Sequence, residues 1–222
     1  MSGEKSEEQN IKERFVKQGL MYAELNEYFA KEFLEEGYSG MELRAYDLPV
    51  QIILRVGKTH DVLGEKKSRI KQVKTLVAKR MGIPEANLEI SVEMVRNKGL
   101  CPMTQAEVIR SKIGSGVQYK RVVNGVMKTI MEAGAQGCEI VISGKLKGQR
   151  ARSAKFVEGR LIHTGGVKEE YMRSATTSVL LKLGVIGIKV TIMLPHDPEG
   201  IDGPSRDMVD KIKVLEPTEI IY

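Results

Sequence analysis

The chain has 222 residues, a formal net charge of +6 and 41% hydrophobic residues, enough apolar material for one large folded domain or two modest ones. No apolar run approaches the ~18 residues of a membrane span, and the polar N-terminal residues lack the apolar stretch of a signal peptide. Neither Cys101 nor Cys138 has a CxxC or CxxH neighbour, so no zinc site or disulfide framework is predicted. These features favour a cytosolic globular protein without a metal or cofactor.

The basic charge is unevenly distributed along the chain. Residues 1–36 contain nine glutamates against five lysines and arginines, so a charge of +10 falls on residues 37–222. A basic body attracts polyanions, because each phosphate that Lys or Arg neutralises releases a condensed counterion. Charge alone leaves open a soluble protein that is merely basic. With no Trp and 5% aromatic residues, the chain lacks the paired stacking aromatics of an RRM, so RNA binding would depend on phosphates and shape.

The first part of the chain is predicted to fold in the order helix, strand, strand, helix, strand. Residues 1–14 are expected to be a disordered acidic tail, after which apolar residues at helical spacing indicate a helix that ends near Gly37. The next expected elements are a hairpin of two strands, a helix and a third strand, over residues 41–45, 50–56, 70–81 and 88–92.

A turn-rich stretch over residues 97–102 predicts a boundary between a domain at 15–97 and a second domain at 98–198. Two helices are expected in the second domain, followed by alternating or β-rich segments that favour a small sheet. The expected segments are helices at 103–113 and 122–134 and strands at 138–142, 151–156, 171–181 and 186–194. The remainder, 199–222, has no clear period and is predicted to be an extended tail that needs a partner to become ordered. The fold class is therefore α+β.

A first basic cluster lies between the second predicted strand and the second predicted helix. Lys66, Lys67 and Arg69 fall in the first turns of that helix, where the macrodipole is already positive and basic residues are mildly destabilising. A nucleic-acid phosphate over the free backbone N–H groups would offset this cost, and Gly64 would allow its close approach. The alternative is a solvated helix end without a ligand.

A second cluster is Tyr119, Lys120 and Arg121, on the opposite side of the predicted helix from Val122 and Val126. These residues should form an exposed polar ridge, although a charged outer helix face needs no ligand.

A third cluster occupies a glycine-punctuated hairpin, in which Glu158 is the single acidic residue. Its cations are Lys145, Lys147, Arg150, Arg152, Lys155 and Arg160. Like charges this dense repel one another unless an anion lies among them, and the planar fork of Arg150 suits a bidentate phosphate contact. A solvated hairpin rim is the alternative.

The order of elements around Gly64–Lys67 resembles a type II KH domain, and Asp61–Ile70 is similar to the corresponding loop of the eukaryotic ribosomal protein S-three family. Further stretches that resemble this family include Ile130–Cys138, Ser143–Ala151 and Gly184–Val190. The resemblance runs from about residue 15 to the C-terminus. It implies an N-terminal type II KH domain followed by a small C-terminal α/β domain with two helices on a four-stranded sheet.

The resemblance also implies a structural protein of the 40S ribosomal subunit head that is not an enzyme. Such a protein is cytoplasmic and is assembled in the nucleus or nucleolus. Lys120 and Arg121 would meet messenger RNA where it enters, and the tail 202–222 would contact neighbouring head proteins and the receptor-for-activated-kinase scaffold. The other expected RNA contacts, to phosphates and ribosomal RNA, are Gly64, Lys66, Lys67, Arg69, Lys145, Lys147, Arg150, Arg152 and Lys155.

Three positions depart from the family's pattern. Lys67 replaces the second glycine of the loop, which predicts a phosphate contact with weak base preference. Asn124 stands where bacterial members carry a further basic residue, and Gln136 stands where a lysine is associated with a DNA-nicking side activity.

Two alternative functions are a DNA-repair lyase or endonuclease and a free KH-domain regulator of particular messages. Against an enzyme, His60, His163 and His196 lack metal-binding spacing, and the sequence has no GxSxG or complete Walker A motif. Against a free regulator, Lys67 disfavours a base-reading groove.

Overall fold

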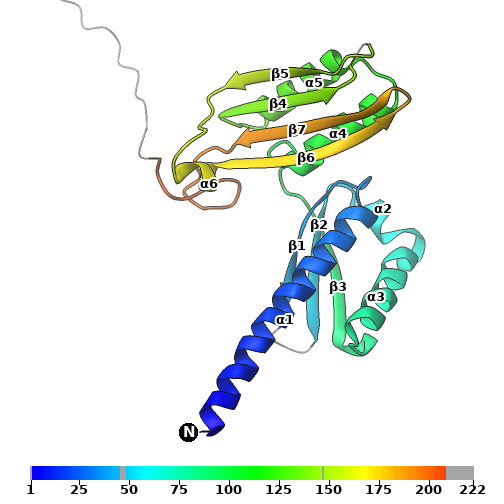
Figure 1. Cartoon of the computed structure of the whole chain (residues 1–222), viewed down its shortest axis with the longest axis vertical. Coiled ribbons are helices and arrows are strands. Elements are labelled where there is room, and N and C mark those ends of the chain that lie inside the picture. The colour runs from blue at the N-terminus through cyan, green and yellow to red at the C-terminus, as the bar shows by residue number, and fades with distance from the viewer. Residues whose placement is uncertain (1, 46–48, 147, 209–222) are drawn as a thin grey trace, which may run out of the picture.

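The structure is a computed structural model and describes residues 2–45, 49–146 and 148–208, with side chains from residue 11 onward. Its helices and strands form two layered parts, one after the other along the chain (Figure 1). The elements of the first part are α1 (Ser2–Glu32), β1 (Tyr38–Arg44), β2 (Val50–Val56), α2 (Thr59–Leu63), the 3-10 turn η1 (Glu65–Lys67), α3 (Ser68–Met81), the 3-10 turn η2 (Glu85–Asn87) and β3 (Leu88–Met94).

The sheet of the first part has the strand order β1-β2-β3. β1 and β2 pair antiparallel as the predicted hairpin, whereas β2 and β3 pair in parallel, with Ile52 opposite Ile90. A parallel pair needs a crossover connection, which here contains α2 and α3. This topology places the loop at Gly64, between α2 and α3, inside the crossover.

The core of the first part lies between the sheet and the apolar stripes of α1 and α3. Leu25 and Phe29 of α1, and Phe33 directly after it, recur every four residues and are at most 3% exposed. They share one buried cluster with Val73 and Val77 of α3. The helical spacing therefore fixes which faces of α1 and α3 meet the sheet.

The first helix is longer at its N-terminus than expected. The residues predicted as a disordered tail, 1–14, are helical from Ser2 onward, and α1 ends at Glu32 rather than near Gly37. Glu, Lys and Gln have good helix propensity and extend a helix without burying apolar surface. Gly37 adopts a left-handed conformation, with φ +73°, in the turn that leads into β1.

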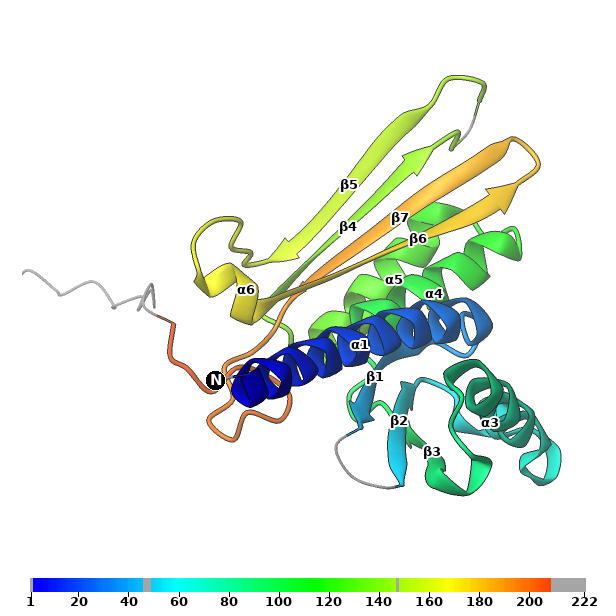
Figure 2. The same cartoon turned by 60° about the horizontal axis from the view of Figure 1, so that its bottom comes forward.

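The second part contains a four-stranded antiparallel sheet with the order β5-β4-β7-β6. Two helices cover one face of this sheet, as predicted, with α5 against β4 and α4 against β6 and β7 (Figure 2). The short helix α6 was not predicted. The elements are α4 (Pro102–Gly114), α5 (Tyr119–Glu132), β4 (Gly137–Gly144), β5 (Arg152–Gly159), α6 (Val167–Tyr171), β6 (Met172–Leu181) and β7 (Gly184–Met193).

A direct contact joins the two parts where β1 meets the segment before α4. The Ser39 Oγ and the Cys101 Sγ lie 3.0 Å apart, and Cys101 is buried. The predicted domain limits, 15–97 and 98–198, stay a prediction.

The start of the predicted C-terminal tail is a folded loop rather than an extended segment. The Asp197 carboxylate accepts backbone hydrogen bonds from Glu199, Ile201 and Asp202, at 2.9–3.0 Å. Met208 is buried in a cluster with Tyr171, whose hydroxyl donates to the Arg206 carbonyl oxygen at 2.6 Å. A turn closed on one carboxylate needs no partner protein to be ordered.

Candidate nucleic-acid interface

The loop between α2 and α3 combines exposed lysines with a backbone that side chains rarely adopt. Lys66 and Lys67 have φ values of 52° and 61°, in the left-handed region that favours glycine. Both side chains are exposed, and the first turn of α3 contains no acidic residue. Within the described ranges, neither lysine side chain forms an ion pair. The loop therefore presents two ammonium groups, as the sequence predicted, but on strained backbone.

Gly64 is required by packing at the start of this loop. Its φ is +67°, and a Cβ added there would lie 3.0 Å from the Cβ of Arg69. Another residue would be disfavoured by both the conformation and the close neighbour. Gly64 therefore brings the backbone of the loop close to the first turn of α3.

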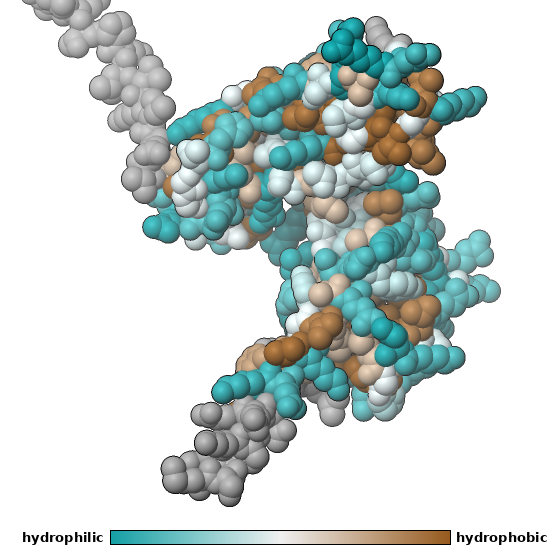
Figure 3. All heavy atoms as spheres, viewed as in Figure 1, coloured by the Kyte–Doolittle hydropathy of each residue, from teal (hydrophilic) through white to brown (hydrophobic). Residues whose placement is uncertain are grey.

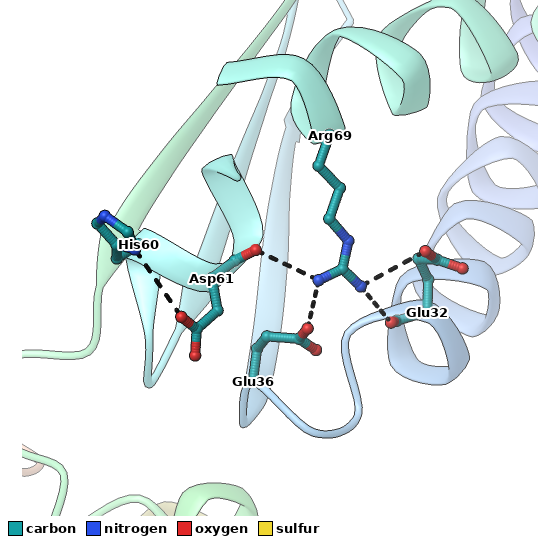
Figure 4. A network of polar contacts seen from close by, with 5 residues as sticks. All are labelled: Glu32, Glu36, His60, Asp61 and Arg69. Carbon is teal, nitrogen blue, oxygen red and sulfur yellow. Dashed lines mark hydrogen bonds and ion pairs between the residues drawn. The ribbon is translucent and has the colours of Figure 1, made fainter. Parts of the chain in front are cut away.

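Arg69 does not present a free guanidinium to a phosphate. It donates a hydrogen bond to Glu36, lies 3.6 Å from a Glu32 carboxylate oxygen and contacts the Asp61 carbonyl oxygen at 3.3 Å (Figure 4). Its guanidinium also sits 5.2 Å from the centroid of the Phe33 ring. The hydrogen bond that Arg69 donates to Glu36 raises the pKa of Arg69 above its ordinary value. Arg69 therefore ties α3 to the end of α1, and its expected RNA contact stays a prediction.

The N-terminal end of α5 carries the second basic cluster, in which Lys120 and Arg121 are exposed as predicted but Tyr119 is partly buried against the core. Lys120 and Arg121 are exposed, and Val122 and Val126, at most 3% exposed, face the core. The first turn of α5 contains no acidic residue. No described residue forms an ion pair with Lys120 or Arg121. Two free cations therefore lie beside a helix end whose dipole is also positive.

The third basic cluster is divided between two faces of the sheet. Side chains alternate along β5, so Arg152 shares a face with Phe156 on the helix side, and Lys155 lies on the opposite face. There the Lys155 Nζ pairs with a Glu139 carboxylate oxygen at 3.1 Å. Lys155 is thus partly neutralised by an acidic residue of β4 that precedes the third basic cluster in the sequence.

Three other described cations of the third cluster lie near the turn between β4 and β5, whereas Arg160 follows the far end of β5. Lys145, Arg150 and Arg152 are exposed, and the described part of the chain offers none of their side chains an ionic partner. Lys147, also predicted to bind RNA, lies outside the described residues. Hydrophilic residues gather around this end of the hairpin (Figure 3).

The fold brings the second and third clusters together around one cavity. Tyr119, Arg150 and Arg152 all line a cavity of about 370 Å³. The Tyr119 ring lies edge-on to Phe156 of β5, with centroids 6.5 Å apart. The sequence separates Tyr119 from Arg150 by a helix and a strand, so their position at one cavity depends on the packing of α5 against the β4–β5 hairpin.

The described residues supply no obvious centre for catalysis. Across the described ranges, no group of three or more His, Cys, Asp or Glu is arranged to hold a metal ion. Burial raises the pKa of Cys138 to about 11, which leaves the thiol protonated and poorly nucleophilic at neutral pH.

Helices that cross a bilayer must be both long and apolar. Of the helices within the described ranges, none meets both conditions.

The described residues form a basic surface with unpaired cations, on a KH-like crossover followed by a helix-covered antiparallel sheet. These features are typical of an RNA-binding protein. Residues 24–100 match the family described as KH domain, and residues 109–192 match the family described as ribosomal protein S3, C-terminal domain. The chain is 52% identical over 210 residues to the small ribosomal subunit protein uS3 of Encephalitozoon cuniculi (strain GB-M1), covering 95% of this chain and 97% of that protein.

The chain therefore belongs to the ribosomal protein S3 family. This membership confirms the predicted family and the α+β fold class with its KH domain, and it identifies a structural protein rather than an enzyme.

Proposed function

We propose that the chain is a structural component of the small ribosomal subunit that holds ribosomal RNA and lines the path by which messenger RNA enters. The observation that carries this proposal is that Arg150 and Arg152 line one cavity with Tyr119, the residue directly before Lys120 and Arg121. None of these four cations has an ionic partner among the described residues. Cations left unpaired by the protein itself repel one another and are stabilised by an external polyanion. Family membership supports a ribosomal RNA as that polyanion.

The proposed contacts divide into two groups. Lys120 and Arg121 meet the incoming message, and the hairpin cations Lys145, Arg150 and Arg152 hold ribosomal RNA phosphates. Gly64, Lys66 and Lys67 add a phosphate contact in the KH part, with little preference for the base. Lys147 and Lys155 are secondary: Lys147 lies outside the described residues, and Lys155 already pairs with Glu139.

The partners and location follow from the same proposal. The protein is assembled in the nucleus or nucleolus and works in the cytoplasm, in the head of the subunit. Its C-terminal tail contacts neighbouring head proteins and the receptor-for-activated-kinase scaffold. Residues 209–222 lie outside the described residues, and these tail contacts are proposed from the family resemblance alone.

Sedimentation of the tagged full-length protein tests the proposal. The protein is expected to travel with small subunits and translating ribosomes. The double change Lys120→Glu and Arg121→Glu should leave this co-sedimentation intact and reduce initiation on structured messages. Lys128→Glu, on the same helix and equally exposed, is the matched control and should have a smaller effect.

Other outcomes point to the rival functions. Tagged protein confined to the light fractions would favour a free KH regulator, and efficient cleavage of abasic DNA by the purified protein would favour a repair lyase. Loss of assembly in the Lys120 and Arg121 variant would show that these residues hold ribosomal RNA rather than the message.

A further inference from the structure

The cavity beside Tyr119 has the form of a site for a flat, uncharged group next to an anion. Leu146 and Ala154 give it apolar walls, and the Tyr119 side chain adds an aromatic one. Its volume, about 370 Å³, lies in the lower part of the ~300–1,000 Å³ range of small-ligand pockets. A group of the size of a single nucleoside fits this range better than an extended duplex.

The aromatic wall is held in place by its neighbours. Tyr119 begins α5 and is only partly exposed, because it packs against the core of the second part. Phe156 holds the ring edge-on at an interplanar angle of 65°. A ring fixed in this way loses little conformational entropy when a second flat group packs against it.

The rim of the cavity is cationic. Arg150 and Arg152 line it, Lys120 follows Tyr119 directly in the chain, and no carboxylate is among the described residues of the lining. The cavity at the junction of the two parts differs, because Glu35, Glu36 and Glu107 line it together with lysines. The cavity beside Tyr119 therefore combines an aromatic wall with a rim that attracts phosphate.

We propose that this cavity takes one unstacked base of a single-stranded RNA, with the base against the Tyr119 ring and its flanking phosphates on Arg150, Arg152 and Lys120. The inference rests on the proposed function and deepens it, because it adds a contact with the base to a surface otherwise described by its charge. Stacking on an aromatic ring tolerates every base, so the site would fix the position of a strand without reading its sequence.

Binding of a labelled single-stranded RNA of about ten nucleotides to the purified full-length chain tests this inference. Tyr119→Leu keeps an apolar side chain against Phe156 but removes the ring, and should lower affinity by roughly fivefold to 100-fold without changing the salt dependence. Tyr119→Phe should retain the affinity. Tyr22→Leu, an exposed tyrosine of α1, is the matched control and should bind as the original chain does.

The phosphate contacts are measured separately. Arg150→Gln and Arg152→Gln should each reduce the slope of log affinity against log salt by about 0.7, the value for one phosphate contact on a single strand. Arg173→Gln is the control, since Arg173 is exposed on β6 at the opposite edge of the sheet. An RNA of the same length with abasic positions should bind the original chain and the Tyr119→Leu variant equally.

Two results of the binding measurements, and one of a crosslinking experiment, would overturn the inference. If Tyr119→Leu binds normally while the Lys120 and Arg121 variant binds weakly, the base pocket is excluded and the proposed function stands. If neither change affects binding, both proposals fail. Ultraviolet crosslinking of the unaltered chain to the RNA covers the case in which Tyr119→Leu misfolds: crosslinks are expected at Tyr119 or within 146–154, and crosslinks confined to other segments would contradict the pocket.

Discussion

The loop at Gly64 and the cavity beside Tyr119 are both basic, yet the arginines of the two regions have different surroundings. In the KH part, Arg69 is surrounded by Glu36, Glu32 and the Phe33 ring, so its charge is already matched within the fold. In the C-terminal part, Arg150 and Arg152 have no described partner and share a cavity with an ordered aromatic ring. A count of basic residues does not distinguish these two sites. They differ in whether each arginine has an ionic partner among the described residues.

The largest effect expected from this comparison is on stability, at Arg69. Arg69→Ala leaves Glu36, whose side chain is 10% exposed, without its partner. We expect the free energy of unfolding, measured by denaturant titration, to fall by about 1–3 kcal/mol, since a buried polar group is left unsatisfied. The control is Arg80→Ala, because Arg80 also links α3 to α1, through the more exposed Glu24.

Exposed ion pairs contribute about 0–1 kcal/mol to the free energy of unfolding, so Arg80→Ala should change that free energy little. Equal losses in the two variants would show that the Arg69 network has no special structural role. A loss of RNA affinity in Arg69→Ala, with stability unchanged, would restore Arg69 as a phosphate ligand.

A smaller effect is expected from the strained backbone of the loop. Lys67→Gly should raise the free energy of unfolding by about 0.5–1 kcal/mol, because relief of the left-handed conformation outweighs the extra freedom of glycine in the unfolded chain. Lys71→Gly in α3 is the matched control, which should destabilise by roughly 0.5–1 kcal/mol because it lies inside a regular helix.

The salt dependence of RNA binding by Lys67→Gly tests whether Lys67 also contacts a phosphate. Loss of one ammonium should reduce the salt slope by about 0.7 if Lys67 contacts a phosphate. An unchanged slope would remove Lys67 from the interface, and a less stable variant would show that the side chain makes a compensating contact.

The smallest effect concerns the folded loop after β7 and its dependence on pH. Backbone N–H groups, chiefly of Asp202 and Glu199, hold the pKa of Asp197 below its ordinary value. Because the pKa of Asp197 is lowered by folding, the ionised Asp197 carboxylate stabilises the folded loop. This stabilisation is complete above the pKa of Asp in the unfolded chain, about 3.9, and is lost as the pH falls through the lower pKa of the folded chain. The Met208 methyl resonance, measured by NMR, should therefore move toward its unfolded position only in that acidic range.

Asp197→Ala should produce the same change in the Met208 resonance at neutral pH. The control is Asp207→Asn, which removes an exposed carboxylate outside the set of backbone hydrogen bonds. A Met208 resonance that is unaffected in Asp197→Ala would show that the Tyr171 cluster orders the loop without the Asp197 turn.

Much of the fold was predictable because its strongest signals are local. Val50, Ile52 and Leu54 alternate, and Val122 and Val126 keep helical spacing, so β2 and α5 were placed correctly. The folded loop after β7 was missed although its signal was available, since Asp197, Pro198 and Gly200 favour a turn. The helical residues before position 15 were missed because their sequence has no periodic apolar pattern, which is the signal used to predict an amphipathic helix.

The candidate site was less predictable, because its decisive contacts join distant residues. Glu36 lies 33 residues before Arg69, and nothing in the turn after α1 marks it as an ionic partner. Glu139 neutralises Lys155 only through the register of β4 and β5, which a sequence pattern does not give. For the same reason the cavity that joins Tyr119 to Arg150 was not foreseen, although both residues had been placed in basic clusters.

The salt dependence of RNA binding, compared between two sets of arginine variants, tests the central claim most directly. The double variant Arg150→Gln and Arg152→Gln should lose about 0.7 of slope for each phosphate contact removed, whereas Arg69→Gln should keep the slope of the original chain. A reduced slope in Arg69→Gln, together with an unchanged slope in the double variant, would contradict the account.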